Sequence, residues 1–177
     1  IGSRMQTRFI AKSEIRDWPI IGWLALSAGA FFIRRGAGGA KPLLERMQPH
    51  LDSGGSVALF PEGTTTDGRS VRTFHARIFE AAIVARCPLQ PVALRYENTS
   101  DGYAVAPFIG DDDFVSHLWR ILRTPSLRVH LDFLPQLQPE GERNALARRC
   151  EQLVRDRVLA GPGHDNESQA DFDPVRA

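Results

Sequence analysis

The segment that decides the fold is SVALFPEGTTTDGRS, residues 56–70. Ser56 to Phe60 has the length and composition of a buried β-strand, and Pro61 to Ser70 is a polar loop with glycines and three consecutive threonines. Apolar residues then recur at helical spacing, at Phe74, Ile78, Ala81, Ala82 and Ala85. Strand, loop and helix in this order indicate an α/β unit, and α/β sheets bind ligands in loops at the carboxyl ends of strands.

The same alternation extends in both directions along the chain. Further strands are predicted at 7–11, 30–33, 91–96 and 127–134. Further helices are predicted at about 13–28, 43–51, 114–122 and 140–159. We therefore expect an α/β fold with a mixed, largely parallel sheet flanked by helices, in one domain over residues 1–160. The polar and acidic residues 161–177 are expected to form a disordered tail.

Composition excludes several classes of protein. A chain of 177 residues with a formal net charge of +1 forms one domain and gives no reason to expect nucleic acid as a partner. The two cysteines, Cys87 and Cys150, are too few for a disulfide framework or a zinc site and are expected to be buried free thiols. The charge-free run from Trp18 to Ile33 is too short and too interrupted to span a membrane. It fits a buried core element, our first interpretation, or an interfacial helix.

The loop at 61–70 is a candidate anion site. A following helix would offer free backbone N–H groups, and Arg69 and Arg72 add positive charge. Gly63 to Ser70 also reads G-x-x-x-x-G-R-S, one residue from a nucleotide-binding P-loop, but the missing lysine argues against that reading. The acidic residues 111–113 precede an apolar periodic run, so we expect them to cap a helix rather than to bind a metal.

Three short motifs carry a family resemblance. Residues 60–64 (FPEGT) resemble the third signature block of the PlsC-like lysophosphatidate and glycerol-3-phosphate acyltransferases. Residues 29–35 (GAFFIRR) resemble the second block, and 88–92 (PLQPV) resemble the fourth, in the order and spacing of the family. Residues 8–14 and 18–23 also resemble the stretch that joins the first two blocks. The resemblance covers roughly residues 1–160.

The resemblance implies roles for individual residues. Phe32, Ile33 and Arg35 would shape the acceptor site, with Arg35 holding the phosphate. Glu62 and Gly63 would help place the glycerol phosphate, with Thr64 lining the loop. Structural positions in the motifs are Gly29, Pro61, Pro88 and Pro91. Many relatives have Arg-Ser where this chain has Thr65-Thr66, which leaves Arg69 or Arg72 as substitute cations and leaves the acceptor open. Alternatives remain, namely Arg35 as a surface ion-pair residue and Glu62 as the partner of Arg69 or Arg72.

The family's first block, H-x-x-x-x-D, supplies the catalytic base and the residue that orients it. Among the five histidines, only His75 has an acidic residue, Glu80, at this spacing. On a helix the two side chains would point about 140° apart, so this pair does not fit. We therefore expect no catalytic residue in this chain, the His and Asp lying upstream of Ile1, and the fragment to be inactive. The alternative is a pseudo-enzyme that binds lipid without turnover.

The resemblance implies acyl transfer from acyl-CoA or acyl carrier protein to the free hydroxyl of a lysophospholipid, with 1-acyl-glycerol-3-phosphate as first candidate, in phospholipid biosynthesis. No metal or cofactor is implied. The implied partners are these substrates, acyl carrier protein and a membrane surface. The implied location is the cytoplasmic face of a bacterial inner membrane.

Overall fold

A parallel sheet forms the N-terminal part of the protein. The computed structural model describes residues 7–18, 20–33, 41–96, 105–109, 113–124 and 127–160. Strand β1 (Thr7–Lys12) lies between β2 (Phe31–Ile33) and β3 (Ser56–Ala58), and both pairings are parallel. The predicted strand 56–60 ends at Ala58, and Phe60 is exposed.

Two helical segments connect β1 to β2. A 3-10 helix, η1 (Ser13–Asp17), is followed by α1 (Ile21–Ser27). Gly22 has to be glycine, because a Cβ there would lie 2.1 Å from the carbonyl oxygen of Arg16. The core interpretation of the run 18–33 is correct for Phe31, which is buried, but wrong for α1. The large apolar side chains around this short helix are exposed, namely those of Trp18, Ile20, Trp23, Leu24 and Leu26.

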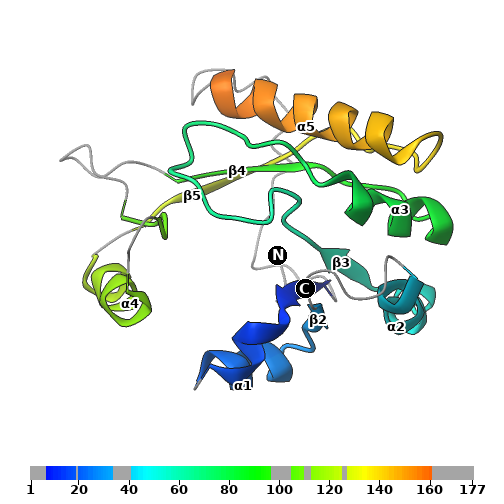
Figure 1. The fold of residues 1–177 in the computed structure, drawn as a ribbon. Coiled ribbons are helices and arrows are strands. Elements are labelled where there is room, and N and C mark those ends of the chain that lie inside the picture. Colours follow the sequence, from blue (N-terminus) through cyan, green and yellow to red (C-terminus); the bar gives the residue numbers. More distant parts are fainter. Residues whose placement is uncertain are drawn as a thin grey trace, which may run out of the picture.

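The second sheet is antiparallel and belongs to the C-terminal part. Strand β4 (Val92–Tyr96) pairs with β5 (Val129–Phe133). Leu89, which precedes β4, forms an isolated antiparallel bridge with Leu137, which follows β5. Helix α2 (Lys41–Asp52) precedes β3, and α3 (Ala76–Ala85) and α5 (Arg143–Ala160) pack against each other, with α5 alongside β4 (Figure 1). The expectation of a mixed α/β fold with helices around a sheet is confirmed, with the parallel and antiparallel strands in separate sheets.

The main hydrophobic core lies between α3, α5 and β4. On α5 the predicted apolar face is buried at Leu146, Cys150 and Val154. On α3 the most buried side chain is Phe79, which lies outside the predicted stripe. The reason is that α3 contacts both α5 and α2, so its buried face is wider than one stripe. This core spans residues 71–154 and does not include the parallel sheet.

The two cysteines differ in burial. Both are free thiols, but Cys150 is buried in the core and Cys87 is only half-buried, so the prediction of two buried thiols is correct for Cys150 alone. Burial raises the pKa of the Cys150 thiol to about 11.

An ion-pair cluster ties β4, β5 and α5 together. Asp132 accepts hydrogen bonds from Arg95 at 2.9 Å and from Arg157 at 3.0 and 3.1 Å. Burial alone would raise the pKa of Asp132, but the hydrogen bonds and charges of Arg157 and Arg95 outweigh it and hold that pKa below its ordinary value. Asp132 is therefore a structural carboxylate between two strands and a helix.

The remaining helix, α4 (Phe114–Arg123), confirms one capping prediction. The carboxylate of Asp113 accepts from the backbone N–H of Ser116 at 3.0 Å, as an N-cap does. Asp111 and Asp112 are not among the described residues, and neither is the predicted tail 161–177. Within the described ranges, no helix is both long enough and apolar enough to cross a membrane.

Candidate functional site

Two of the sequence motifs leave the parallel sheet at the same edge. Lys12 at the end of β1 is level with Ile33 at the end of β2, and Ala58 at the end of β3 is level with Phe9. Because all three strands are parallel, β2 and β3 end in the same direction on either side of β1, β2 at the level of Lys12 and β3 at the level of Phe9. The described end of the second motif and the start of the third thus lie on the same side of the sheet.

The loop from Leu59 to His75 folds back on itself through its own polar groups. The backbone N–H of Gly63 donates to the carbonyl oxygen of Phe60 at 3.1 Å, and that of His75 donates to the carbonyl oxygen of Pro61 at 2.9 Å. The Glu62 carboxylate accepts from the backbone N–H of Arg72 at 2.8 Å. Glu62 thus closes the loop through a backbone contact rather than through the guanidinium pairing considered from sequence.

Gly63 is required by both its backbone and its neighbour. Its φ is +65°, which disfavours residues with a side chain. A Cβ at this position would lie 3.0 Å from the Cδ2 and Nε2 atoms of His75. His75 therefore lies beside the motif loop and is also the residue before α3.

Helix α5 anchors the other end of the loop. The Oε2 atom of Glu151 accepts from the backbone N–H of Phe74 at 3.0 Å, and the Phe74 side chain is buried in the main core. Arg155 holds the other carboxylate oxygen of Glu151. The loop is thus joined to the parallel sheet through Ala58 and fixed to the C-terminal core through Phe74.

Helix α3 does not directly follow residues 61–70 as the sequence suggested. It begins at Ala76, after the non-helical residues 71–75, and the backbone N–H of its N-cap residue His75 donates to the carbonyl oxygen of Pro61. A P-loop places its helix directly after the G-K-[ST] residues. The segment here lacks both the lysine and the helix, so the P-loop alternative is wrong.

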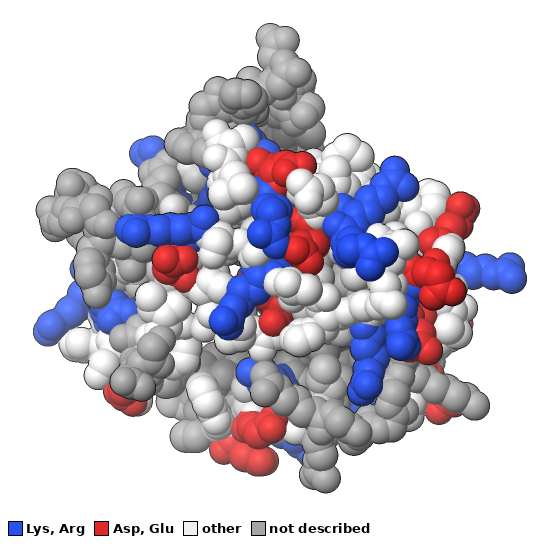
Figure 2. All heavy atoms as spheres, turned by 45° about the horizontal axis from the view of Figure 1, so that its top comes forward, with Lys and Arg blue, Asp and Glu red and all other residues white. Residues whose placement is uncertain are grey.

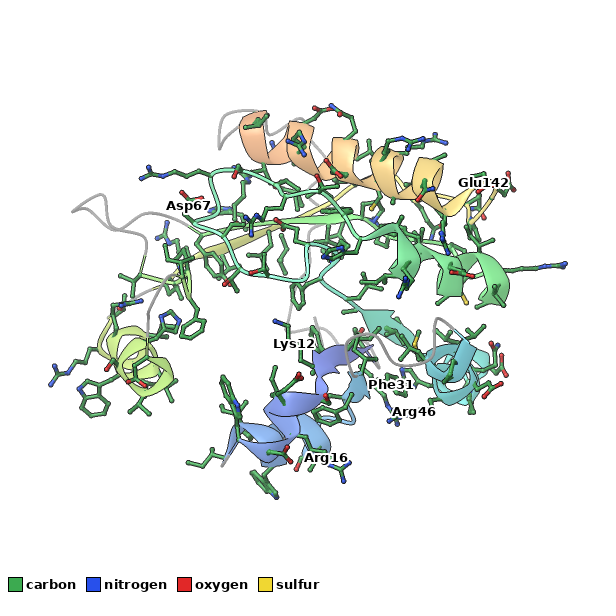
Figure 3. The ribbon with its side chains drawn as sticks, in the orientation of Figure 1. Lys12, Arg16, Phe31, Arg46, Asp67 and Glu142 are labelled. Atoms are coloured by element: carbon green, nitrogen blue, oxygen red, sulfur yellow. The ribbon has the colours of Figure 1, made fainter. Side chains whose placement is uncertain are left out.

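The other cations of the loop lie in the solvent. Arg69 and Arg72 are exposed, and so is Thr64. The backbone N–H of Arg69 donates to Asp67 in a local turn at 3.0 Å (Figure 3 labels Asp67). The two arginines remain candidates for an anion, without a contact that fixes their guanidinium groups.

The second motif is described only in part. Phe32 and Ile33 are half-buried in β2, and the carbonyl oxygen of Phe32 accepts from Nη1 of Arg46 at 3.0 Å. Gly29 has φ +68° and ends α1, as predicted. Arg35, the predicted phosphate ligand, lies outside the described residues, so its role stays a prediction.

The fourth motif begins β4. Helix α3 ends at Ala85, before Pro88, and Pro91 is buried with its carbonyl oxygen accepting from the backbone N–H of Leu134 at 3.0 Å. The two prolines thus lie where the chain turns from α3 into the antiparallel pair, in agreement with a structural role.

Lys12 is a candidate that the sequence reasoning missed. It is exposed at the end of the central strand, between the ends of β2 and β3. Figure 3 shows it between the loop above and α1 below in that view. The signal was available, because the argument applied to Arg35, a cation directly after a parallel strand, applies equally to Lys12.

His75 and Glu80 do not form a catalytic pair. Glu80 accepts a 2.6 Å ion pair from Arg143, and His75 lies one turn earlier against Gly63. The other described histidines make local contacts. His50 lies 3.0 Å from the carbonyl oxygen of Ser56 through its Nε2 atom, and His117 lies 2.7 Å from Arg120 through Nδ1.

Comparison with known proteins identifies the family. The model of the family described as Acyltransferase matches residues 2–95, which include the parallel sheet and the FPEGT loop. This chain belongs to the acyltransferase family. The PlsC-like resemblance of its motifs is thereby confirmed.

Two named relatives of this acyltransferase-family chain act on different lysolipids. It is 44% identical over 156 residues to the lyso-ornithine lipid O-acyltransferase of Pseudomonas aeruginosa, covering 88% of this chain and 60% of that protein. It is 32% identical over 150 residues to the 1-acyl-sn-glycerol-3-phosphate acyltransferase of Neisseria meningitidis, covering 83% and 59%. The chain thus spans about three fifths of the length of these relatives.

A solved structure supports the fold. The 1-acyl-sn-glycerophosphate (LPA) acyltransferase PlsC from Thermotoga maritima matches with a TM-score of 0.57 at 19% identity. The match covers 87% of this chain and 56% of that one. At this identity the likeness concerns the fold, and it confirms the α/β architecture beyond the segment matched by the family model.

Proposed function

We propose that the whole protein transfers a fatty acyl group from an acyl thioester to the free hydroxyl of a lysolipid. The observation that supports the proposal is the parallel sheet of a chain of the acyltransferase family, in which β2, ending at Ile33, and β3, which leads into the FPEGT loop, lie on either side of β1. The acceptor oxygen attacks the thioester carbonyl carbon, the carbon–sulfur bond breaks, and the thiol leaves with the proton taken from the hydroxyl. Acyl-CoA and acyl carrier protein are the two donor classes.

The catalytic base is proposed to lie outside these 177 residues. The spacing of the histidines supports this, since His75 is followed by Glu80 and the latter pairs with Arg143. The described residues therefore bind and position the acceptor, and the pseudo-enzyme alternative predicts lipid binding with no product even from the longer protein. Turnover by the longer protein separates the two.

The first acceptor to test is lyso-ornithine lipid. Two observations favour it over 1-acyl-glycerol-3-phosphate, the candidate from sequence. The relative named for it is 44% identical, against 32% for the relative named for the phosphate lipid. In addition, Thr65 and Thr66 replace the Arg-Ser pair that many relatives carry, which removes one phosphate-binding cation. Lysophosphatidate remains the second candidate, because Lys12, Arg69 and Arg72 are exposed cations that can attract its phosphate.

The proposal includes a membrane surface, because both acceptors are membrane lipids. Its support is the apolar surface of α1, where Ile20, Trp23 and Leu24 are exposed next to η1. Aromatic and aliphatic side chains on one short helix are suited to the bilayer interface or to the acyl chain of the acceptor. The cytoplasmic face of the membrane is proposed with it.

The test is an acyl-transfer assay on the protein with its full reading frame. Acyl-CoA and acyl carrier protein thioesters are offered with each acceptor, and the product is measured by mass spectrometry. Product from neither acceptor would refute the proposal. Arg35→Ala and Lys12→Ala are expected to raise the KM for the acceptor, with Arg77→Gln, an exposed arginine on α3, as the matched control. If lysophosphatidate saturates the Arg35 variant as readily as wild type, Arg35 is not its phosphate ligand.

A further inference from the structure

Helix α4 faces the protein with polar groups and the solvent with apolar ones. The inward residue is His117, which is 7% exposed and packs edge-on against Phe108, with ring centroids 5.1 Å apart. Arg120, one turn later, bonds to Nδ1 of His117 at 2.7 Å. In a helix that packs on a globular core the apolar stripe lies inside. Here the orientation is reversed.

The outward face is a continuous apolar stripe. Its members are spaced i, i+3, i+4 and i+7 and expose from 39% to 70% of their surface, namely Val115, Leu118, Trp119 and Leu122. Neighbours at this spacing lie on one side of a helix. Single exposed apolar residues are common on protein surfaces, but four on one ten-residue helix indicate a contact surface.

No described element covers this stripe. Among the described helices and strands, α4 packs extensively against none, whereas α3 and α5 pack on each other. In Figure 1, α4 lies apart from the main body, on the lower side together with α1. Figure 2, which turns the upper side forward, shows basic and acidic side chains interspersed over that face.

The basic residues of α4 favour an anionic surface as its partner. Residues 114–123 contain two arginines and a histidine but no acidic residue. The guanidinium carbon of Arg123 lies 5.0 Å from the ring centroid of Trp119, so the cation stands beside the apolar stripe. Tryptophan is enriched at the level of lipid headgroups, and arginine attracts anionic lipids there. An apolar face with a tryptophan and a flanking arginine is suited to a helix that lies in a membrane interface.

We propose that α4 docks onto an anionic bilayer, inserting Val115, Leu118, Trp119 and Leu122 below the headgroups while Arg123 binds lipid phosphate. The buried His117 ring packs on Phe108, and this contact turns the helix so that the stripe points away from the body. The inference does not require acyl transfer, because vesicle binding is measured without turnover, so its failure and that of the proposed function are seen separately.

The test uses Trp119 as a reporter in the 177-residue chain. Trp18→Phe with Trp23→Phe leaves Trp119 as the single tryptophan. Vesicles of phosphatidylcholine with phosphatidylglycerol are expected to shift its emission to the blue, and brominated lipids to quench it. Vesicles of phosphatidylcholine alone should act more weakly. Unchanged Trp119 emission while the protein sediments with vesicles would show that another element makes the contact and would overturn the proposal.

Variants of the stripe measure its strength. Leu118→Ser with Leu122→Ser is expected to lower the vesicle partition coefficient at least about tenfold, because two leucines no longer enter the apolar layer. Arg123→Gln should lower it about fivefold on anionic vesicles only. The matched control is Val84→Ser, an exposed apolar residue on α3. Equal binding by the leucine variant and the control refutes the proposal, and so does a blue shift that grows with protein concentration without vesicles, which identifies a second copy as the occupant.

Discussion

Replacing Gly63 by alanine tests how the motif loop is held. The substitution has two costs, a side chain at φ +65° and a Cβ placed 3.0 Å from the imidazole of His75. The first costs about 1 kcal/mol in the left-handed region. The second forces the ring or the loop to move and adds about 1 kcal/mol, at the lower end for an overpacked site. We expect Gly63→Ala to lower the free energy of unfolding by about 2 kcal/mol.

The same loop offers a matched control. Gly68 has φ +77°, and a Cβ there would meet no atom within 4 Å. Gly68→Ala therefore carries the backbone cost alone, about 1 kcal/mol. The difference between the two alanine variants isolates the contact with His75. In a His75→Ala background that contact is removed, so Gly63→Ala should cost no more than Gly68→Ala does.

Urea unfolding followed by circular dichroism gives the required precision. With a slope of about 2 kcal/mol per molar urea, each 1 kcal/mol moves the midpoint by about 0.5 M. The reasoning is wrong if Gly63→Ala and Gly68→Ala unfold at the same midpoint in the wild-type background. It is also wrong if His75→Ala leaves their difference unchanged, since the imidazole would then not be the neighbour that resists the methyl group.

Three further predictions concern stability and reactivity. Asp132→Asn should lower the free energy of unfolding in urea by about 3 kcal/mol, because it leaves two partly buried arginines without their carboxylate. Glu80→Gln breaks an exposed ion pair and should lower it by under about 0.5 kcal/mol. The stability that Asp132 contributes should be fully present above its ordinary pKa of 3.8 and be lost as the pH falls through the lower pKa of the folded protein. If Asp132→Asn were as stable as wild type at neutral pH, this ion-pair role would be wrong. Iodoacetamide should label Cys87 in the folded protein and Cys150 only on unfolding, as mass spectrometry of the peptides would show. Asp113→Ala should lower stability by about 1 kcal/mol through loss of the α4 cap, and an unchanged thermal midpoint would argue against that cap.

The elements were predictable where local pattern alone decides them. The glycines that follow two helices, Gly29 and Gly54, have the positive φ that favours glycine at a helix end. The apolar period of α5 predicts its buried face correctly. What a face meets is a different matter. Periodicity located the stripe of α4 through Leu118 and Leu122, but it cannot say whether a stripe faces a core or the solvent. The same limit applies to Trp23, whose apolar character suggested burial.

The site was predictable as a set of motifs and not as a set of contacts. The signature glycine Gly63 was found from its motif, but the packing of His75 beside it was not. The bond between Glu62 and the backbone of Arg72 does not follow from charge, because a carboxylate among arginines suggests an ion pair. The bond from Phe74 to Glu151 joins residues 77 positions apart, and no local pattern reports such a contact.

That long-range bond means that the FPEGT loop takes its position from a helix with no motif in it. If Glu151 or its neighbours on α5 shift, the amide of Phe74 shifts with them, and so does the stem of the loop. Homologues could thus adjust which lipid fits while FPEGT stays letter for letter the same. A search for determinants of acceptor choice should read the C-terminal helix as closely as the signature blocks.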